Sequence, residues 1–117
     1  MGTRPEPRYR KRIPCKLTRS RSTFSGLVVD LSSRGLFVQT SAVAKTGDDI
    51  EIVIRSWNSE TTIVLNAQVM WRRKVPRQLR SAVEGGLGLQ ICYAPEPYYI
   101  MLAEASQDSI SNRGRGV

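Results

Sequence analysis

The sequence predicts an all-β domain, a six-stranded antiparallel β-barrel followed by one C-terminal helix. Apolar residues alternate with polar residues along several short segments, which is the periodicity of β-strands. Turn residues recur between these segments about every 8 to 12 residues, as in small sandwiches and barrels. After Pro95 the apolar residues recur at three and four positions instead, which indicates a helix.

Six segments carry the strand pattern. In the first, Ile13, Cys15 and Leu17 alternate with polar residues, so one face of the strand is apolar. The second and third flank a run of turn residues and predict a hairpin over 24–40. Closing the strands into a barrel would remove exposed edges. The predicted strands are 13–17, 24–29, 36–40, 50–54, 63–69 and 87–91.

Turn chemistry predicts the connections between these strands. Asp, Ser and Gly residues at 30–35 and 46–49 favour tight turns. Residues 57–59 are expected to close the hairpin between the fourth and fifth strands. Residues 72–83 are basic and contain Pro76, which favours a loop before the last strand.

The C-terminal part is expected to form a helix that packs on the barrel. Tyr98, Met101, Leu102 and Ala105 lie on one face of a helix over about 96–107. The chain is therefore divided into a flexible basic N-terminal arm (1–12), a β-barrel (13–94), a C-terminal helix (95–108) and a disordered tail (109–117).

The charge of the chain indicates an anionic partner. Eighteen Lys and Arg residues outnumber ten Asp and Glu residues, which gives a formal charge of +8 and a pI of about 10.2. The basic residues gather in residues 1–22 and 72–80 rather than along the predicted strands. This distribution suits a nucleotide, a nucleic acid or an acidic membrane surface.

An enzyme is not expected. The chain has no histidine, which removes the commonest general base, and it has no metal-ligand spacing or phosphate-loop motif. Cys15 and Cys92 form no C-x-x-C motif and fall in predicted strands, so we expect two buried free thiols. We expect no metal and no cofactor.

The chain is expected to be a cytoplasmic protein without membrane insertion. No apolar run approaches the ~20 residues that span a bilayer. The first residues are basic and contain proline, so they do not resemble a signal peptide. We expect a monomer or a weak dimer.

Two short motifs carry the candidate site. Arg8 and Arg12 form an R-x-x-x-R motif in the arm, and Asp30, Ser32 and Gly35 form a D-x-S-x-x-G motif at a predicted turn. The arginine fork matches guanine N7 and O6, and it also binds phosphate oxygens. A carboxylate accepts hydrogen bonds from guanine N1–H and the N2 amine. Together the motifs predict a site for a guanine nucleotide.

Each residue of the second motif has an expected role. Asp30 is expected to accept from guanine N1 and N2, and Ser32 to bind ligand oxygens or a neighbouring amino group. For Gly35, a positive φ and a close approach of the ligand both remain open. Arg10 and Lys11 are further candidates that would add charge. The arm is expected to be flexible before binding and to fold over the ligand.

The order and spacing of the two motifs resemble those of the PilZ domain, the bacterial receptor module for cyclic di-GMP. The resemblance extends from Arg8 to Cys92. It includes a glycine followed by an apolar strand at 35–38, a strand end with valine and tryptophan at 67–72, and a glycine-rich closing strand at 86–91.

This resemblance implies a PilZ-like split barrel with six strands and a C-terminal helix. It implies a stand-alone adaptor whose ligand-bound surface meets a downstream protein partner. Pro7 stands where some members carry a further arginine, which favours one bound ligand over an intercalated pair. The ligand implied is cyclic di-GMP, bound through Arg8, Arg12, Asp30, Ser32 and Gly35.

Two other functions remain open. The same fold can serve as a ligand-independent interaction module. A small basic barrel can also bind nucleic acid, but such binders usually present several surface aromatics for base stacking. Trp57 and Trp71 lie near predicted strand ends, and Tyr98 and Tyr99 are expected against the barrel, so nucleic acid is not favoured. The basic residues of 72–80 are a solvated loop or one edge of a partner surface.

Overall fold

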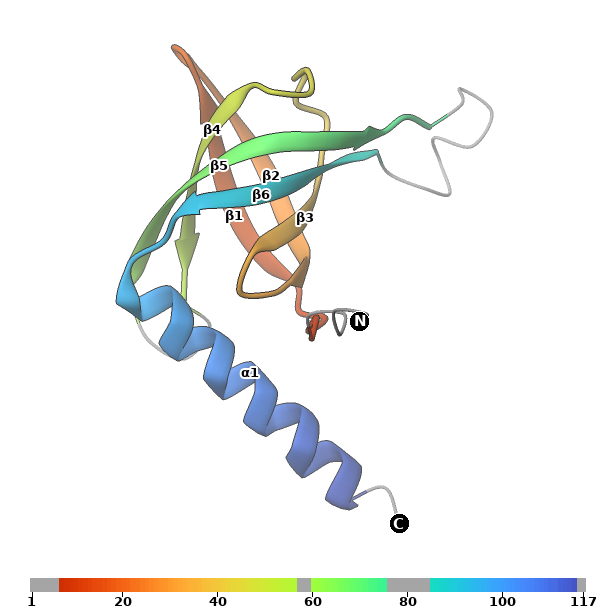
Figure 1. The fold of residues 1–117 in the computed structure, drawn as a ribbon, viewed down its shortest axis with the longest axis vertical. Helices are drawn as coiled ribbons and strands as arrows, with labels where there is room; N and C mark the ends of the chain where they lie inside the picture. The colour runs from red at the N-terminus through yellow and green to blue at the C-terminus, as the bar shows by residue number, and fades with distance from the viewer. Residues whose placement is uncertain (1–6, 57–59, 76–84, 116–117) are drawn as a thin grey trace, which may run out of the picture.

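The computed structural model describes residues 7–56, 60–75 and 85–115, with side chains up to residue 107. It contains six strands and one helix in the predicted order (Figure 1). Their bounds are β1 Ile13–Arg19, β2 Ser22–Leu31, β3 Gly35–Thr40, β4 Asp49–Arg55, β5 Thr62–Arg73, β6 Gly86–Tyr93 and α1 Glu96–Arg115.

The strands form a closed barrel in the order β1-β2-β3-β6-β5-β4. Every neighbouring pair is antiparallel. Closure pairs each strand on both sides, which satisfies backbone groups that an open sheet would leave at its edges. The predicted fold, a six-stranded antiparallel barrel with one C-terminal helix, is confirmed.

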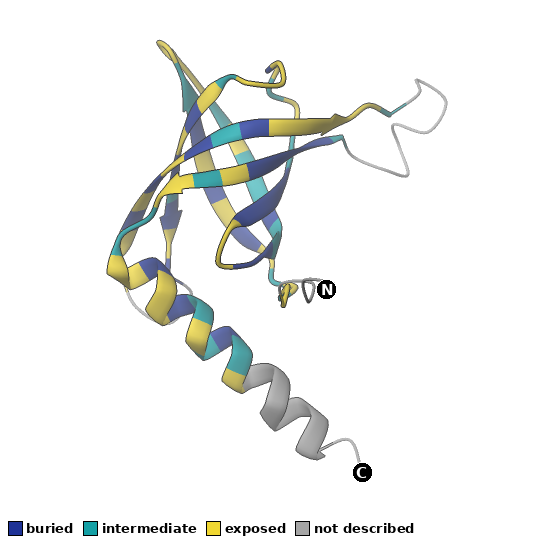
Figure 2. Cartoon of the chain, viewed as in Figure 1, coloured by how far each residue is buried: buried dark blue, intermediate teal, exposed yellow. Residues whose placement is uncertain are grey.

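Buried and exposed residues alternate along the strands (Figure 2), and the buried ones form the core of the barrel. In β1, Ile13, Cys15 and Leu17 are buried whereas Lys16 is exposed. The largest fully buried side chains include Leu17, Leu31, Leu36, Ile52, Ile54, Ile63, Leu65 and Leu87. Burial of such side chains contributes about 1.5–3 kcal/mol each relative to exposure, which makes this core the main source of stability.

Helix α1 covers one end of the barrel (Figure 1). Tyr98, Met101 and Ala105 are buried and Leu102 is half-buried against the core, so the predicted packing face is confirmed. The Tyr98 hydroxyl donates a hydrogen bond of 2.6 Å to the carbonyl of Ser32. No helix among the described residues is long and apolar enough to span a membrane.

Helix α1 continues to Arg115, past the expected end near 107 or 108. The prediction relied on apolar spacing, which ends at Ala105, whereas backbone hydrogen bonds between residues i and i−4 continue through polar residues. The expected tail at 109–117 therefore lies largely within the helix.

Strands β2 and β5 both extend further than predicted. Asp30 and Leu31 belong to β2 rather than to the turn at 30–35, and Arg72 and Arg73 extend β5 rather than beginning a loop. Arg73 of β5 pairs with Gly86 of β6, so the two strands stay paired beyond the end of the alternating apolar residues of β5. The predicted turn at 57–59 and the loop residues 76–83 lie outside the described residues.

The two cysteines differ in environment. Cys15 is buried in the core, as expected, but Cys92 is exposed. Leu87 and Leu89 are buried inward positions of β6, and strand alternation directs Cys92 to the opposite face. The expectation of two buried thiols is therefore wrong for Cys92.

Candidate functional site

The arm is attached to the barrel along β2. The Tyr9 N–H donates to the Leu31 carbonyl at 2.8 Å, and the Leu31 N–H donates to the Tyr9 carbonyl at 3.0 Å. Strand β1 pairs with β2 as far as Ile13 and Val28, so this bridge continues the same antiparallel pairing after a one-residue shift. The arm is predicted to be flexible because it lacks apolar anchors, but in its described part, 7–12, backbone hydrogen bonds at Tyr9 hold it to β2.

A groove of about 680 Å³ lies between the arm and the outer face of the barrel, and we call it the arm groove. Its volume falls within the usual range of small-molecule sites, about 300–1,000 Å³. The structure brings five predicted site residues together here, from two distant parts of the chain. The lining residues are Arg8, Arg10, Lys11, Arg12, Val29, Asp30, Phe37, Gln39, Trp71 and Arg73.

An ion pair joins the two motifs across this groove. The Arg8 Nε donates to Asp30 Oδ1 at 2.7 Å, and the two side chains are 47% and 31% exposed. The pairing of β2 with β3 shifts between Val28 and Asp30, and such a bulge redirects the side chains of a strand. Because the pair is open to water, it is weak, and an incoming anion or hydrogen-bond donor can replace either partner.

Two aromatic rings form a shelf beside the ion pair. Phe37 of β3 and Trp71 of β5 both lie opposite Gly88 of β6. Because Gly88 has no side chain, the rings meet over it and stack with centroids 5.1 Å apart and planes 18° apart. The Arg73 guanidinium carbon lies 4.7 Å from the centre of the Phe37 ring. Phe37 is buried on the outer face, whereas Trp71 is 53% exposed and open to a ligand.

The sequence pattern does not predict the stacking of Phe37 on Trp71. The local signal was present in β6, where Gly86 and Gly88 alternate with the buried Leu87 and Leu89. Two glycines on the outward side of a strand leave a bare strip of backbone, which neighbouring strands can cover with large side chains. Identifying Phe37 as one of these neighbours required the strand order and register.

Ser32 and Gly35 are not among the described residues that line the arm groove. Ser32 is fully buried, and its Oγ accepts hydrogen bonds from the N–H groups of Arg34 and Gly35 at 3.3 and 3.1 Å. The Ser32 N–H donates to the Gly35 carbonyl at 2.8 Å, which closes the turn. This hydroxyl holds the turn that follows Asp30.

The structure gives Gly35 a role other than a positive φ or a close approach of the ligand. Positive φ values occur at Ser20 and Gly47 among the described residues, not at Gly35. A Cβ atom on Gly35 would lie 2.6 Å from the carbonyl oxygen of Leu89. Glycine therefore allows β3 to approach β6 closely at the start of the strand.

The environment of Cys15 does not activate its thiol as a nucleophile. Burial raises the pKa of the Cys15 thiol to about 11, which keeps it protonated at neutral pH. Among the described residues, no three His, Cys, Asp or Glu side chains gather as a metal site requires. The groove instead offers guanidinium forks, one carboxylate and an aromatic face, which are groups for binding a planar anionic ligand.

Two solved structures share this fold. The inhibitor of motility MotI/DgrA from Bacillus subtilis matches with a TM-score of 0.78 and 14% identity, over 97% of this chain and 54% of that protein. The chain thus spans about half the length of the Bacillus protein. The PilZ domain of YcgR from Escherichia coli, determined with cyclic di-GMP, matches with a TM-score of 0.69 and 15% identity, over 99% of this chain and 100% of that one.

These identities are low, so the two likenesses establish the fold alone. No curated protein sequence matches this chain significantly. The PilZ domain family matches residues 3–104, which include both sequence motifs and the whole barrel. The chain therefore belongs to the PilZ domain family.

Proposed function

We propose that this protein is a receptor for cyclic di-GMP that acts as an adaptor, without catalysis. The observation that carries the proposal is the arm groove, where four cations of the arm meet Asp30 and the Phe37–Trp71 shelf. Membership of the PilZ family supports it, and the fold is shared with a YcgR domain whose structure contains cyclic di-GMP.

Each group in the groove has a matching feature on the ligand. The Arg8 and Arg12 guanidiniums bind guanine N7 and O6 or a phosphate, because their forked donors fit both. The Asp30 carboxylate accepts from guanine N1–H and the N2 amine. The exposed face of Trp71 stacks on a base, a contact that contributes about 1–3 kcal/mol per base in nucleic-acid binders. Arg10 and Lys11 add positive charge.

Ser32 and Gly35 act on the ligand indirectly in this proposal. Their hydrogen bonds fix the turn after Asp30 and hold the start of β3 against β6. Pro7 supplies no additional arginine before the motif, which favours one bound cyclic di-GMP, whereas Arg10 and Lys11 supply charge that suits an intercalated pair; calorimetric stoichiometry decides between them.

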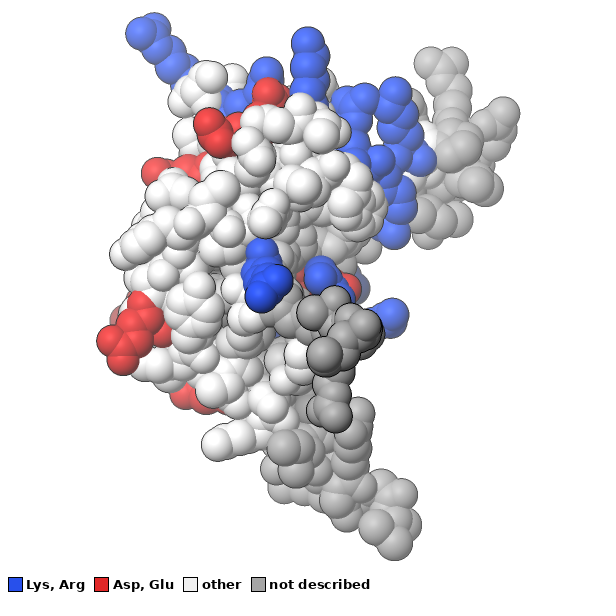
Figure 3. Space-filling model, in the orientation of Figure 1, with Lys and Arg blue, Asp and Glu red and all other residues white. Residues whose placement is uncertain are grey.

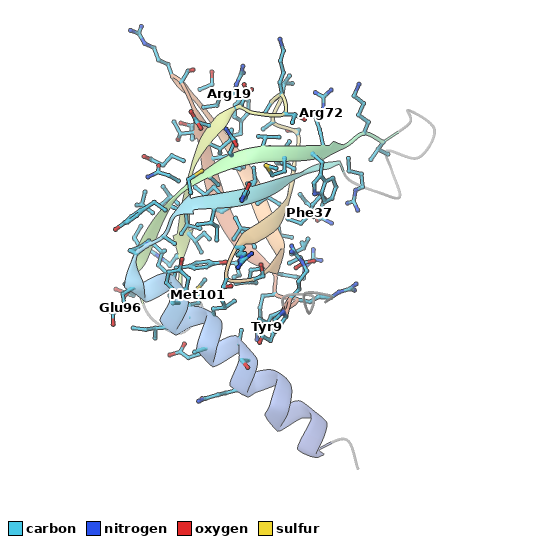
Figure 4. All side chains as sticks on the ribbon, in the orientation of Figure 1. Tyr9, Arg19, Phe37, Arg72, Glu96 and Met101 are labelled. Atoms are coloured by element: carbon cyan, nitrogen blue, oxygen red, sulfur yellow. The ribbon has the colours of Figure 1, made fainter. Side chains whose placement is uncertain are left out.

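Ligand binding changes the arm because the Arg8–Asp30 ion pair has to open. Both partners of that pair are assigned to the ligand, so the arm moves from its carboxylate partner to the nucleotide. Tyr9, between the two arginines, lies on the side of the barrel that faces α1 (Figure 4). It lines a small hollow with Tyr99 and Leu102 of α1. Movement of the arm therefore alters a surface shared with α1, and this altered surface signals to a downstream protein partner.

Calorimetric titration with cyclic di-GMP, cyclic di-AMP and GMP tests this function. We expect saturable binding that is selective for cyclic di-GMP. Arg12→Ala should lose about 1–3 kcal/mol of binding free energy, because an arginine fork reading guanine contributes that much. Arg21→Ala, in the β1–β2 turn and outside the groove, is the matched control and should bind like the wild type.

The outcome that contradicts the proposal is equal affinity of Arg12→Ala and the wild type, or no heat with any nucleotide. The second result would instead favour the ligand-independent interaction module. Asp30→Ala adds a test of base recognition, since losing the carboxylate should reduce the preference for cyclic di-GMP over cyclic di-AMP. Unchanged discrimination would remove Asp30 from that role.

A further inference from the structure

A second groove of about 870 Å³ lies beside the arm groove and has no role in the function proposed above. It lies where β5 and β6 project beyond the barrel, and we call it the β5-end groove. Three consecutive cations, Arg72, Arg73 and Lys74, form one wall, and all three are exposed. Figure 3 shows Lys and Arg side chains gathered on this side of the molecule.

The groove is a consequence of strand register. Leu27, Gln39, Gly86 and Arg73 are successive partners across β2, β3, β6 and β5, so they form one row on the outer face. Gly86 lines the groove in the middle of this row and is buried beside the Phe37 ring, because a Cβ atom there would lie 2.5 Å from Phe37 Cζ and 2.5 Å from the carbonyl oxygen of Val38. The row therefore leads from the polar side chain of Gln39 past Gly86 to the basic side chain of Arg73.

The lining chemistry is suited to an acidic chain. No Asp or Glu is found among the described lining residues. The Arg72 Nη1 donates to the Ala44 carbonyl at 3.3 Å, and a guanidinium has five donors in total. On the opposite side, the Thr40 hydroxyl donates to the Ser25 carbonyl at 2.9 Å and accepts from the Ala42 N–H at 3.1 Å, and the Ser25 hydroxyl accepts from Lys16 Nζ at 3.1 Å. The Gln39 amide on the same side can bond to a peptide backbone.

We propose that the β5-end groove docks an extended acidic segment of a partner protein. Charge complementarity indicates that the occupant is acidic. The lining residues come from four strands, β2, β3, β5 and β6, which suits an extended chain. A nucleic acid fits less well, because none of the described lining residues is aromatic and base stacking has no platform. The aromatic rings Phe37 and Trp71 line the neighbouring arm groove instead.

Docking at this groove is linked to the nucleotide site. Gln39 and Arg73 line both grooves, and Arg73 also lies over Phe37 of the shelf. A nucleotide and an acidic segment are both anionic and both bind Arg73, so binding of one weakens binding of the other. The coupling is reciprocal by thermodynamic necessity. This step rests on the proposed function, whereas docking itself does not.

The test is fluorescence-polarisation titration of a labelled octaglutamate peptide at about 0.15 M salt. The double variant Arg72→Glu/Lys74→Glu should weaken peptide binding roughly tenfold, because two attractions become repulsions. The matched control is Arg21→Glu/Arg55→Glu, which makes the same charge change at exposed sites outside the groove. It should bind within about twofold of the wild type.

Equal losses in both double variants, or no binding by the wild type, would overturn the proposal. So would a polyuridine oligonucleotide that binds more tightly than the peptide and loses affinity in the same groove variant. Lys74→Glu alone, which alters no hydrogen bond described above, keeps the test informative if thermal unfolding shows that the double variant is damaged.

Adding saturating cyclic di-GMP then tests the coupling, and it should lower peptide affinity severalfold in the wild type. Unchanged peptide affinity, with calorimetry confirming that the nucleotide is bound, would overturn the coupling. Absence of nucleotide binding in calorimetry would refute the receptor function while the peptide titration without nucleotide still decides docking.

Discussion

At the scale of single residues, the D-x-S-x-x-G motif contains two kinds of group. Asp30 faces the arm groove and pairs with Arg8, whereas the Ser32 hydroxyl is buried and bonds to backbone N–H groups of its own turn. The Ser32 carbonyl also accepts from the Tyr98 hydroxyl of α1. The motif therefore joins a ligand-facing carboxylate to a turn that is fixed from inside.

Replacing Ser32 separates a positioning role from direct ligand contact. Ser32→Ala leaves the buried Gly35 N–H without its side-chain acceptor, so the free energy of unfolding should fall by about 1–3 kcal/mol. Urea unfolding measures this change. Ser33→Ala, an exposed neighbour, should stay within about 0.5 kcal/mol of the wild type. A Ser32→Ala protein with unchanged stability but much weaker nucleotide binding would show a direct contact instead.

The residues of the two motifs were predictable from the sequence. Which of them line the groove and which hold the turn was not predictable. Arg8, Arg12 and Asp30 were identified because their chemistry matches guanine, and the structure places all three on one groove. Ser32 carries an equally suitable hydroxyl, but its burial depends on how α1 closes the barrel. Gly35 is needed because of Leu89, which is distant in sequence.

At the scale of elements, β6 organises both grooves through its two outward glycines. Gly88 lies under the Trp71 indole, and Gly86 lies beside the Phe37 ring and lines the β5-end groove. The alternation of Leu87 and Leu89 predicted this strand correctly. The same alternation says nothing about which rings cover the outward glycines, because that follows from pairing with β3 and β5.

Adding one methyl group to β6 tests whether the shelf is part of the nucleotide site. In Gly88→Ala the new methyl group overlaps the Trp71 indole, so the ring has to leave its stack on Phe37. We expect a changed Trp71 fluorescence spectrum and a loss of about 1 kcal/mol or more in nucleotide binding, the scale of a base-stacking contact.

Two controls make that result specific. Gln90→Ala, at the next outward position of β6, should leave both the fluorescence and the affinity unchanged. Trp71→Ala should weaken binding at least as much as Gly88→Ala, and the double variant should show little further loss. Full affinity in Gly88→Ala with a displaced indole would exclude Trp71 from the site.

At the scale of the whole molecule, the arm, the outer face of four strands and the projecting end of β5 form one basic surface. The strand order β2-β3-β6-β5 places the arm groove and the β5-end groove side by side, although their residues come from the N-terminal arm, the first hairpin and the last strands. Helix α1 closes one end of the same barrel and meets the arm at Tyr9. This arrangement places the proposed nucleotide site beside the proposed docking groove.

The most direct test of the nucleotide site is a titration of cyclic di-GMP followed by two-dimensional ¹H–¹⁵N NMR. We predict that the Trp71 indole N–H and the backbone N–H groups of Arg8 to Arg12, Asp30 and Gly88 shift together and saturate. The Trp71→Phe variant identifies the indole signal, since Trp57 is the other tryptophan. Backbone signals from Glu51, Val53 and Arg55 of β4, which does not line the arm groove, should not move. No shifts at saturating nucleotide, or shifts that leave Trp71, Asp30 and the arm unchanged, would contradict the proposed site.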